Sequence, residues 1–251
     1  TPTFTTNIAN ATLTYCTDAT LTANSVWTTD APSITNAGSQ TIHVKAAFEN
    51  YKNDTCEYTL TVTPRPVTVR SADGQFTYNG QAHVSHSASV TSETDFLEAV
   101  TYRFTGSQTE VGESSNYFTI AWDSIHTEAI EANYDVTYVY GTLEVTALGG
   151  ITVTIVGNSN VDGPFVYEGT TYTVSGYVID AITLGEEPTT LYTADDFTFN
   201  GSASVTQANA GEYGMGLTSN MFANINPNFN SVTFVVTDGK LYIDPYPVTV
   251  N

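Results

Sequence analysis

The chain has 251 residues, of which 26 are acidic and six are basic, so its formal net charge at pH 7 is −20. This charge disfavours binding to nucleic acids or to anionic lipid surfaces, so neither is predicted as a partner. The hydrophobic fraction of 41% is enough to build cores, and there is no run of about 18 apolar residues that would predict a transmembrane helix.

The first predicted element is a set of short β-strands over residues 1–63. Residues 41–46 alternate between polar and apolar side chains, which predicts a strand with Ile42 and Val44 facing inward. Residues 12–16 and 56–60 are rich in Thr and Tyr and are also predicted as strands. Residues 1–63 are therefore interpreted as a short, divergent first repeat.

The two cysteines, Cys16 and Cys56, lie in an early and a late strand of this first repeat. A disulfide between them is the preferred interpretation, because it would stabilise the shortest repeat if their Cα atoms come within about 7 Å. Such a bond would indicate an oxidising compartment. The alternative is a pair of reduced, buried thiols.

Two further repeats are predicted, over residues 64–147 and 148–245. A Pro-Arg-Pro linker opens the second repeat, and a Gly-Gly pair near the start of the third is a softer linker. The sequence Pro-Tyr-Pro-Val-Thr-Val at 245–250 is similar to the opening of the second repeat. Residues 246–251 are therefore expected to begin another repeat of a longer protein.

Three features recur in the same order in each repeat: a Gly-centred turn, a loop in which Asn precedes an aromatic residue, and a closing strand. The turns contain Gly38, Gly112 and Gly211, and the loops are Asn50-Tyr51, Asn133-Tyr134 and Asn228-Phe229. Glycine at the turn indicates positive φ, and the loop aromatics are predicted to plug the ends of sandwiches.

The fold predicted from these features is all-β. Strands at intervals of about 8–12 residues with turns between them favour tandem immunoglobulin-like β-sandwich domains in an elongated array. β-grasp-like repeats with a short helix are the alternative. Residues 218–222 fit one helical turn with Thr218 as its N-cap.

Several of these motifs resemble the MBG-type, immunoglobulin-like repeats of bacterial cell-surface proteins. The resemblance covers residues 64–245 best, and it rests on motifs in both later repeats: Tyr78-Asn79-Gly80-Gln81, Tyr167-Glu168-Gly169-Thr170, Ala210-Gly211-Glu212-Tyr213, Asn228-Phe229 and Thr237-Asp238-Gly239-Lys240-Leu241. The first repeat lacks the Tyr-x-Gly turn. The resemblance implies a secreted or wall-attached protein whose repeats form stalks or adhesive arms, and it implies no catalytic residue.

Candidates for metal chemistry are weak in the sequence. His83 and His86 are three apart in a predicted strand and would point to opposite faces, and His83 takes the position of Tyr172 in the next repeat, so a packing role is predicted. The acidic pairs Asp195-Asp196, Glu186-Glu187 and Asp238-Gly239 lack the spacing of a calcium loop. No metal, cofactor or catalytic residue is therefore predicted.

Aromatic residues supply the remaining candidate site. Trp122 is the tentative glycan-binding residue, because an exposed indole can stack on a sugar, and Trp27 is a second candidate. Against this, aromatic residues in strands more often belong to the core.

The sequence thus predicts a non-catalytic, extracellular repeat module that is secreted or attached to the cell wall and acts as a stalk or spacer. The alternative is an adhesin or glycan-binding module. A host or microbial glycan or protein is the class of partner considered.

Overall fold

The computed structural model describes residues 3–90, 100–122 and 131–250, which form β-strands joined by turns and two 3-10 helices. The prediction of an all-β sandwich fold is confirmed, since the strands are arranged in several separate sheets. The chain divides into two compact units. The first comprises Thr1–Ala72, Ser85–Thr105 and Asn116–Gly141, and the second comprises Asp73–Val84, Gly106–Ser115 and Thr142–Asn251.

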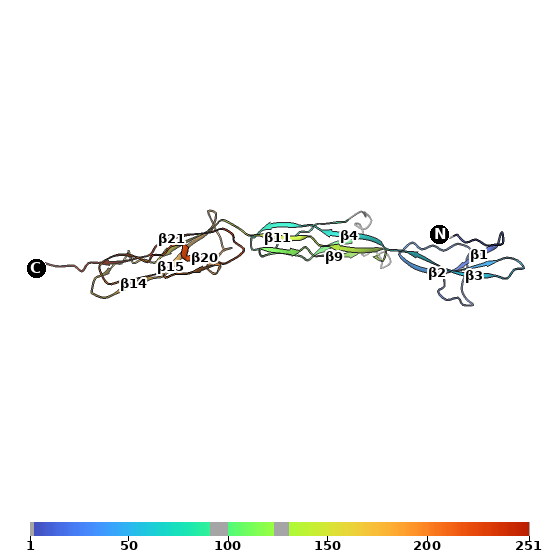
Figure 1. Cartoon of the computed structure of the whole chain (residues 1–251), viewed down its shortest axis with the longest axis horizontal. Coiled ribbons are helices and arrows are strands. Elements are labelled where there is room, and N and C mark those ends of the chain that lie inside the picture. Colours follow the sequence, from blue (N-terminus) through green and yellow to red (C-terminus); the bar gives the residue numbers. More distant parts are fainter. Residues whose placement is uncertain (1–2, 91–99, 123–130, 251) are drawn as a thin grey trace. The chain divides into compact units, whose positions relative to one another are not determined.

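A three-stranded antiparallel sheet forms the first repeat (Figure 1). Its strands are β1 (Thr12–Cys16), β2 (Gly38–Ala47) and β3 (Asp54–Val62), with β2 in the centre. Ile42 and Val44 of β2 are buried, which confirms the prediction from their alternation. β3 is an edge strand of this sheet and is exposed along most of its length.

The predicted disulfide between Cys16 and Cys56 is wrong, because both thiols are free. Cys16 lies opposite His43 and Cys56 lies opposite Val44, so β2 runs between the two cysteines. Two strand spacings place their Cα atoms about 9–10 Å apart, beyond the reach of a disulfide. Their partners are consecutive residues of β2, so the cysteines also face opposite sides of the sheet. The inference of an oxidising compartment therefore loses its basis.

The second repeat contains three small sheets. Its strands are β4 (Arg65–Ser71), β5 (Gly74–Thr77), β6 (Ala88–Val90), β7 (Val100–Phe104), β8 (Gly112–Ser115), β9 (Phe118–Trp122), β10 (Tyr134–Val139) and β11 (Thr142–Thr146). The sheets have the orders β10-β4-β6, β7-β9 and β5-β11-β8. The first two enclose a core of Val67, Val69, Val100 and Phe118.

The third repeat is larger and lies within the second unit. Its elements are β12 (Ile151–Gly157), β13 (Phe165–Val166), β14 (Tyr172–Ser175), β15 (Tyr177–Leu184), β16 (Glu187–Pro188), η1 (Ala194–Asp196), β17 (Phe197–Phe199), β18 (Ser204–Gln207), β19 (Gly211–Gly214), η2 (Ser219–Met221), β20 (Phe222–Asn224), β21 (Val232–Thr237) and β22 (Lys240–Asp244). Thr218 precedes the 3-10 turn η2, so the predicted helical turn is present. The core contains Ile151, Val153, Ile155, Tyr192, Phe197, Leu217, Phe222 and Phe229.

The second and third repeats share one connectivity. The opening strand pairs in parallel with a late strand in both, as β4 with β10 and β12 with β21. The closing strand pairs in parallel with an early strand and antiparallel with the turn strand, as β11 with β5 and β8 and β22 with β13 and β19. This shared plan supports the equivalence of the two segments. The repeat boundaries and the elongated, tandem arrangement stay predictions.

The turn glycines occupy one register in all three repeats. Gly38 pairs with Val62, Gly112 with Val145, and Gly211 with Ile243. Their φ angles are 141°, 139° and 155°, so the prediction of positive φ is confirmed. The turn glycine therefore pairs with the closing strand in the same way in all three repeats, even where the rest of the repeat differs.

Candidate functional site

The asparagine of the Asn-aromatic loop in the second repeat binds the turn of the first. Asn133 Oδ1 accepts a hydrogen bond from the Ala37 backbone N–H at 2.5 Å, and its Nδ2 donates to Asn36 Oδ1 at 3.0 Å. The Asn133 carbonyl oxygen accepts from the Arg65 backbone N–H at 2.8 Å. One residue thus holds the turn of the first repeat and the linker that follows it.

The third repeat makes the same set of bonds to the second. Asn228 Oδ1 accepts from the Val111 N–H at 2.9 Å, its Nδ2 donates to Glu110 Oε2, and its carbonyl accepts from the Leu148 N–H at 2.9 Å. The partners occupy equivalent positions, because Ala37 and Val111 each precede the turn glycine by one residue. We call each set of three bonds an asparagine joint.

Aromatic packing surrounds the joint at Asn228. Phe229 is 3% exposed, and its ring lies edge-on to Tyr78 of the second repeat, with 5.4 Å between ring centroids, and to Tyr192 of the third at 5.0 Å. Burial, followed by the charges of Glu110 and Asp196, raises the pKa of Tyr78, while a hydrogen bond with Asn228 lowers it. Asn228 itself is 5% exposed, so breaking its side-chain hydrogen bonds would leave a buried amide without a partner, which is costly.

The three Asn-aromatic loops differ in how well their aromatic residues are covered. Phe229 is buried and Tyr134 is half-buried, as predicted for plugs, but Tyr51 of the first repeat is 59% exposed. The plug prediction is therefore wrong for Tyr51. The role of the asparagines was missed in the sequence, although the recurrence of Asn before each aromatic residue was the signal for it.

Trp122, the predicted glycan-binding residue, is half-buried at the end of β9. It lines a shallow groove of about 230 Å³ together with Ile120, Glu131, Tyr134, Val136 and Tyr138. Its ring stacks on Tyr134 at 5.7 Å between centroids and 28° between planes, and it also packs against the core of the second repeat. Much of the indole is therefore committed to packing, and Tyr138, 38% exposed, is the more accessible ring of the groove.

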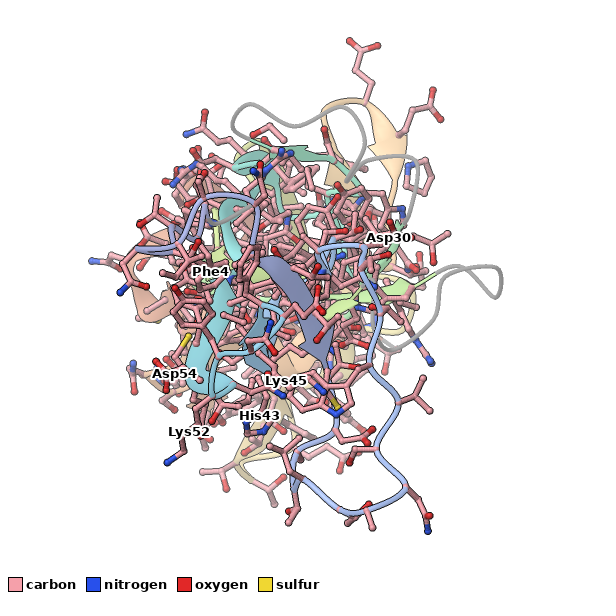
Figure 2. All side chains as sticks on the ribbon, turned by 90° about the vertical axis from the view of Figure 1, so that its right-hand side faces the viewer. Phe4, Asp30, His43, Lys45, Lys52 and Asp54 are labelled. Atoms are coloured by element: carbon pink, nitrogen blue, oxygen red, sulfur yellow. The ribbon has the colours of Figure 1, made fainter. Side chains whose placement is uncertain are left out.

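Trp27, the second aromatic candidate, is covered by a cation. Lys45 Nζ lies 4.3 Å from the centroid of the Trp27 ring, a distance that is typical of a cation–π contact. Lys45 and His43, both labelled in Figure 2, come from the same face of β2. Lys45 therefore covers part of the Trp27 ring face on which a sugar would stack.

His83 has a packing role, as predicted. Its ring stacks on Phe76 with 4.5 Å between centroids and 16° between planes, and Tyr172 stacks on Phe165 at 4.6 Å and 14°. The two pairs are equivalent positions in consecutive repeats. His86 contacts a different ring, Phe104.

Two of the acidic candidates, Asp196 and Asp238, accept hydrogen bonds from neighbouring groups. Asp196 accepts from the backbone and hydroxyl of Thr193 and from Asn226, and Asp238 accepts from the backbone N–H groups of Gly216 and Leu217. No three His, Cys, Asp or Glu side chains gather into a metal-binding group within residues 3–90, 100–122 and 131–250. The described part of the chain also has no helix of the length and apolar character needed to cross a bilayer.

Comparisons with known proteins identify no family for this chain. No protein-family model and no curated protein matches the chain. One similar solved structure is SGBP-B of the Bacteroides ovatus mixed-linkage glucan utilization locus, in complex with a mixed-linkage heptasaccharide. The identity is 12%, the TM-score is 0.16, and the similarity covers 94% of this chain and 61% of that one. A likeness this weak carries no argument about fold or function.

Proposed function

We propose that this chain is a non-catalytic, extracellular repeat module of a bacterial surface protein, secreted or attached to the cell wall, that acts as a stalk or spacer. The resemblance of residues 64–245 to MBG-type repeats belongs to this proposal. The observation that carries it is the asparagine joint, which occurs twice with the same atoms in the same roles. A spacer needs its repeats held in a fixed relation, and a recurring set of bonds from loop to turn and linker supports this role.

The joint limits bending because it fixes three points at once. Asn133 bonds to two residues of the turn and to one residue of the linker, and Asn228 does the same. Each such bond contributes roughly 0.5–1.5 kcal/mol, and a buried donor left without a partner costs about 1–3 kcal/mol. A flexible linker alone would provide no such restraint.

The test is small-angle scattering of the whole chain and of the Asn133→Ala/Asn228→Ala double variant. We expect the wild type to scatter as a stiff particle and the double variant to show greater flexibility with unchanged strand content by circular dichroism. The matched control is Asn79→Ala, whose side-chain oxygen accepts a hydrogen bond from the nearby Gln81 N–H. Identical flexibility in wild type and double variant would contradict the spacer role.

A second candidate function is glycan binding in the Trp122 groove. The observation that favours it is the combination of three aromatic rings and the Glu131 carboxylate along one groove, since sugar sites commonly combine aromatic faces with a few polar groups. The test is calorimetric titration with a panel of neutral oligosaccharides, comparing the wild type with Tyr138→Ala. A glycan site predicts binding that weakens in the variant, and heats of dilution alone throughout the panel would contradict it.

A further inference from the structure

The two strands that flank the Trp122 groove belong to different sheets. Asn116 donates its backbone N–H to the Gly141 carbonyl at 2.8 Å, shortly before β9 begins and shortly after β10 ends. Away from this bond β9 pairs with β7, whereas β10 pairs with β4. A fork therefore opens between β9 and β10, with its closed end at the Asn116–Gly141 bond.

A buried set of polar groups fixes the closed end of the fork. Ser71 Oγ donates to the Asn116 carbonyl at 2.7 Å and accepts from the Gly141 N–H at 2.9 Å. Asn116 Nδ2 donates to the carbonyls of Ala72 and Ser85 at 2.9 and 3.0 Å, and both Ser71 and Asn116 are fully buried. A Cβ on Gly141 would lie 2.5 Å from the Ala72 carbonyl oxygen, so the crossing requires glycine. The fork is thus held in shape by the fold itself.

Exposed tyrosines continue the Trp122 groove toward this closed end. Tyr117 and Tyr140, which neighbour the Asn116–Gly141 bond, are 53% and 40% exposed, and their ring centroids are 4.8 Å apart. The Tyr140 ring is nearly parallel to that of Tyr138, with 6.4 Å between centroids and 17° between planes. Tyr138 also lines the groove. We call Tyr138, Tyr140 and Tyr117 the tyrosine row.

The third repeat has the same strand crossing with different side chains. Met215 donates its N–H to the Gly239 carbonyl at 2.9 Å, in the position of the Asn116 bond. Met215 and Asn116 each lie four residues after the turn glycine of their repeat. Asp238, the residue before Gly239, therefore takes the position of Tyr140.

Asp238 and η2 occupy the place that the tyrosine row leaves open. The Asp238 carboxylate accepts hydrogen bonds from the N–H groups of Gly216 and Leu217 at 3.1 and 2.7 Å. η2 follows and lies against β21, the counterpart of β10. In the second repeat, β9 begins at Phe118, directly after Tyr117. The exposed rings are therefore a property of the second repeat and not of the shared fold.

The chemistry of the fork suits a neutral sugar chain. Aromatic ring faces are negative at their centres, so they complement the weakly positive C–H groups on the flat face of a sugar ring. Burial, followed by the charges of Tyr140 and Glu131, raises the pKa of Tyr138. The Glu131 carboxylate and the phenolic oxygens can accept hydrogen bonds from sugar hydroxyls, whereas the net charge of −20 repels acidic glycans.

The length of the fork indicates a chain of sugars. Phe118 and Trp122 are four strand residues apart, which corresponds to about 13 Å and exceeds the length of one sugar ring. The buried Phe118 ring contacts Tyr138 and Tyr140, with 5.5 and 5.7 Å between centroids. The tyrosine row is therefore supported from below by the core of the second repeat.

We propose that the fork binds a linear, neutral glycan of β-linked sugar units, which lies along the groove and the tyrosine row from Trp122 to Tyr117. Tyr138 contacts short and long chains alike, because it belongs to both the groove and the row. Tyr117 contacts long chains alone. The proposal rests on the second candidate function, glycan binding in the groove, and extends it to a class of ligand and a direction of binding.

The test is calorimetric titration of the whole chain with cello-oligosaccharides, xylo-oligosaccharides and β-manno-oligosaccharides of three and six units. We expect at least one series to bind, with an affinity at least about tenfold higher for six units than for three. Tyr138→Ala is expected to weaken the binding of both lengths. Tyr117→Ala should weaken six-unit binding by about threefold to tenfold and leave three-unit binding within about twofold.

The matched control is Tyr167→Ala in the third repeat, which removes a ring that is 39% exposed, close to the exposure of Tyr138. Its affinity for both lengths should stay within about twofold of the wild type. Because Tyr117 is more than half exposed, Tyr117→Ala is expected to fold, and near-ultraviolet circular dichroism checks this for every variant.

The outcomes separate the extended site from glycan binding itself. Equal affinity for three and six units, or unchanged six-unit affinity in Tyr117→Ala, would overturn the proposal and leave glycan binding in place. Heats of dilution alone with every oligosaccharide would reject both. Tighter binding of decaproline or of oligogalacturonate than of any neutral chain would also overturn the proposal, because aromatic grooves bind proline-rich peptides as well.

Discussion

The first and third repeats share a turn, a closing strand and an Asn-aromatic loop, yet only the third encloses a large core. Among the described residues of the first repeat, the buried apolar side chains are Cys16, Ile42 and Val44. The third repeat buries ten, and eight of these form one core that includes Tyr192 and three phenylalanines. The glycine register is nevertheless the same in both. The recurring motif therefore occurs with cores of different size, which fits its proposed role in joining repeats.

The largest difference is expected at the loop aromatic residue. Phe229→Ala removes a buried ring that contacts Tyr78 and Tyr192, and it is expected to lower the free energy of unfolding by about 3–5 kcal/mol. Tyr51→Ala, the equivalent change in the first repeat, removes a ring that is 59% exposed and should cost less than about 0.5 kcal/mol. Differential scanning calorimetry measures both. Similar losses of unfolding free energy in the two variants would contradict the difference in burial between Phe229 and Tyr51.

A pH effect is expected from the buried phenol of the third repeat. Burial, with a smaller contribution from Asp196, raises the pKa of Tyr192 from 10.0 to about 12. Between these two pH values the unfolded chain loses this proton while the folded chain keeps it, so stability falls as pH rises. The loss reaches roughly 2–3 kcal/mol at pH 12 and is absent below pH 10.

Urea denaturation from pH 8 to 12 measures this loss for the wild type and Tyr192→Phe. The variant is expected to lose about 1 kcal/mol at pH 8, because Tyr192 Oη donates to the Asp196 carbonyl or Asn224 Oδ1 at 3.1 Å. Its stability should then fall less steeply above pH 10. If the free energy of unfolding falls equally with pH in both proteins, the assignment of this pH effect to Tyr192 is contradicted.

A smaller effect is expected at Gly239 of the third repeat, which packs closely against the backbone of Asn158. A Cβ added to Gly239 would lie 2.4 Å from the Asn158 carbonyl oxygen, so Gly239→Ala is expected to lower stability by about 1–3 kcal/mol. Gly163 in the same repeat has nothing within 4 Å of its added Cβ, and Gly163→Ala should change stability by no more than about 0.5 kcal/mol. Thermal unfolding of the two variants compares them, and equal midpoints would contradict the close packing at Gly239.

Local features were predictable from the sequence because they depend on a few neighbouring residues. The positive φ of Gly38, Gly112 and Gly211, and the inward side chains of Ile42 and Val44, follow from glycine's freedom and from the period of a strand. The packing role of His83 followed from its match with Tyr172, and the two stacked rings confirm it.

Features that depend on strand order or on another repeat were not predictable in this way. The predicted disulfide is wrong because the positions of Cys16 and Cys56 along the chain do not show that β2 lies between their strands. The asparagine joints were missed because their partners are 96 and 117 residues away in the sequence. The recurrence of Asn before each aromatic residue marks the asparagines, but no local period or motif identifies their partners over that separation.

Hydrogen exchange at the Ala37 and Val111 amides tests the central claim most directly, because these are the backbone donors of the two asparagine joints. Both amides should be protected in the wild type. Asn133→Ala should speed exchange at Ala37 by about fivefold or more with no change at Val111, and Asn228→Ala should do the reverse. Unchanged exchange at both amides in both variants would contradict the claim that these asparagines hold consecutive repeats together.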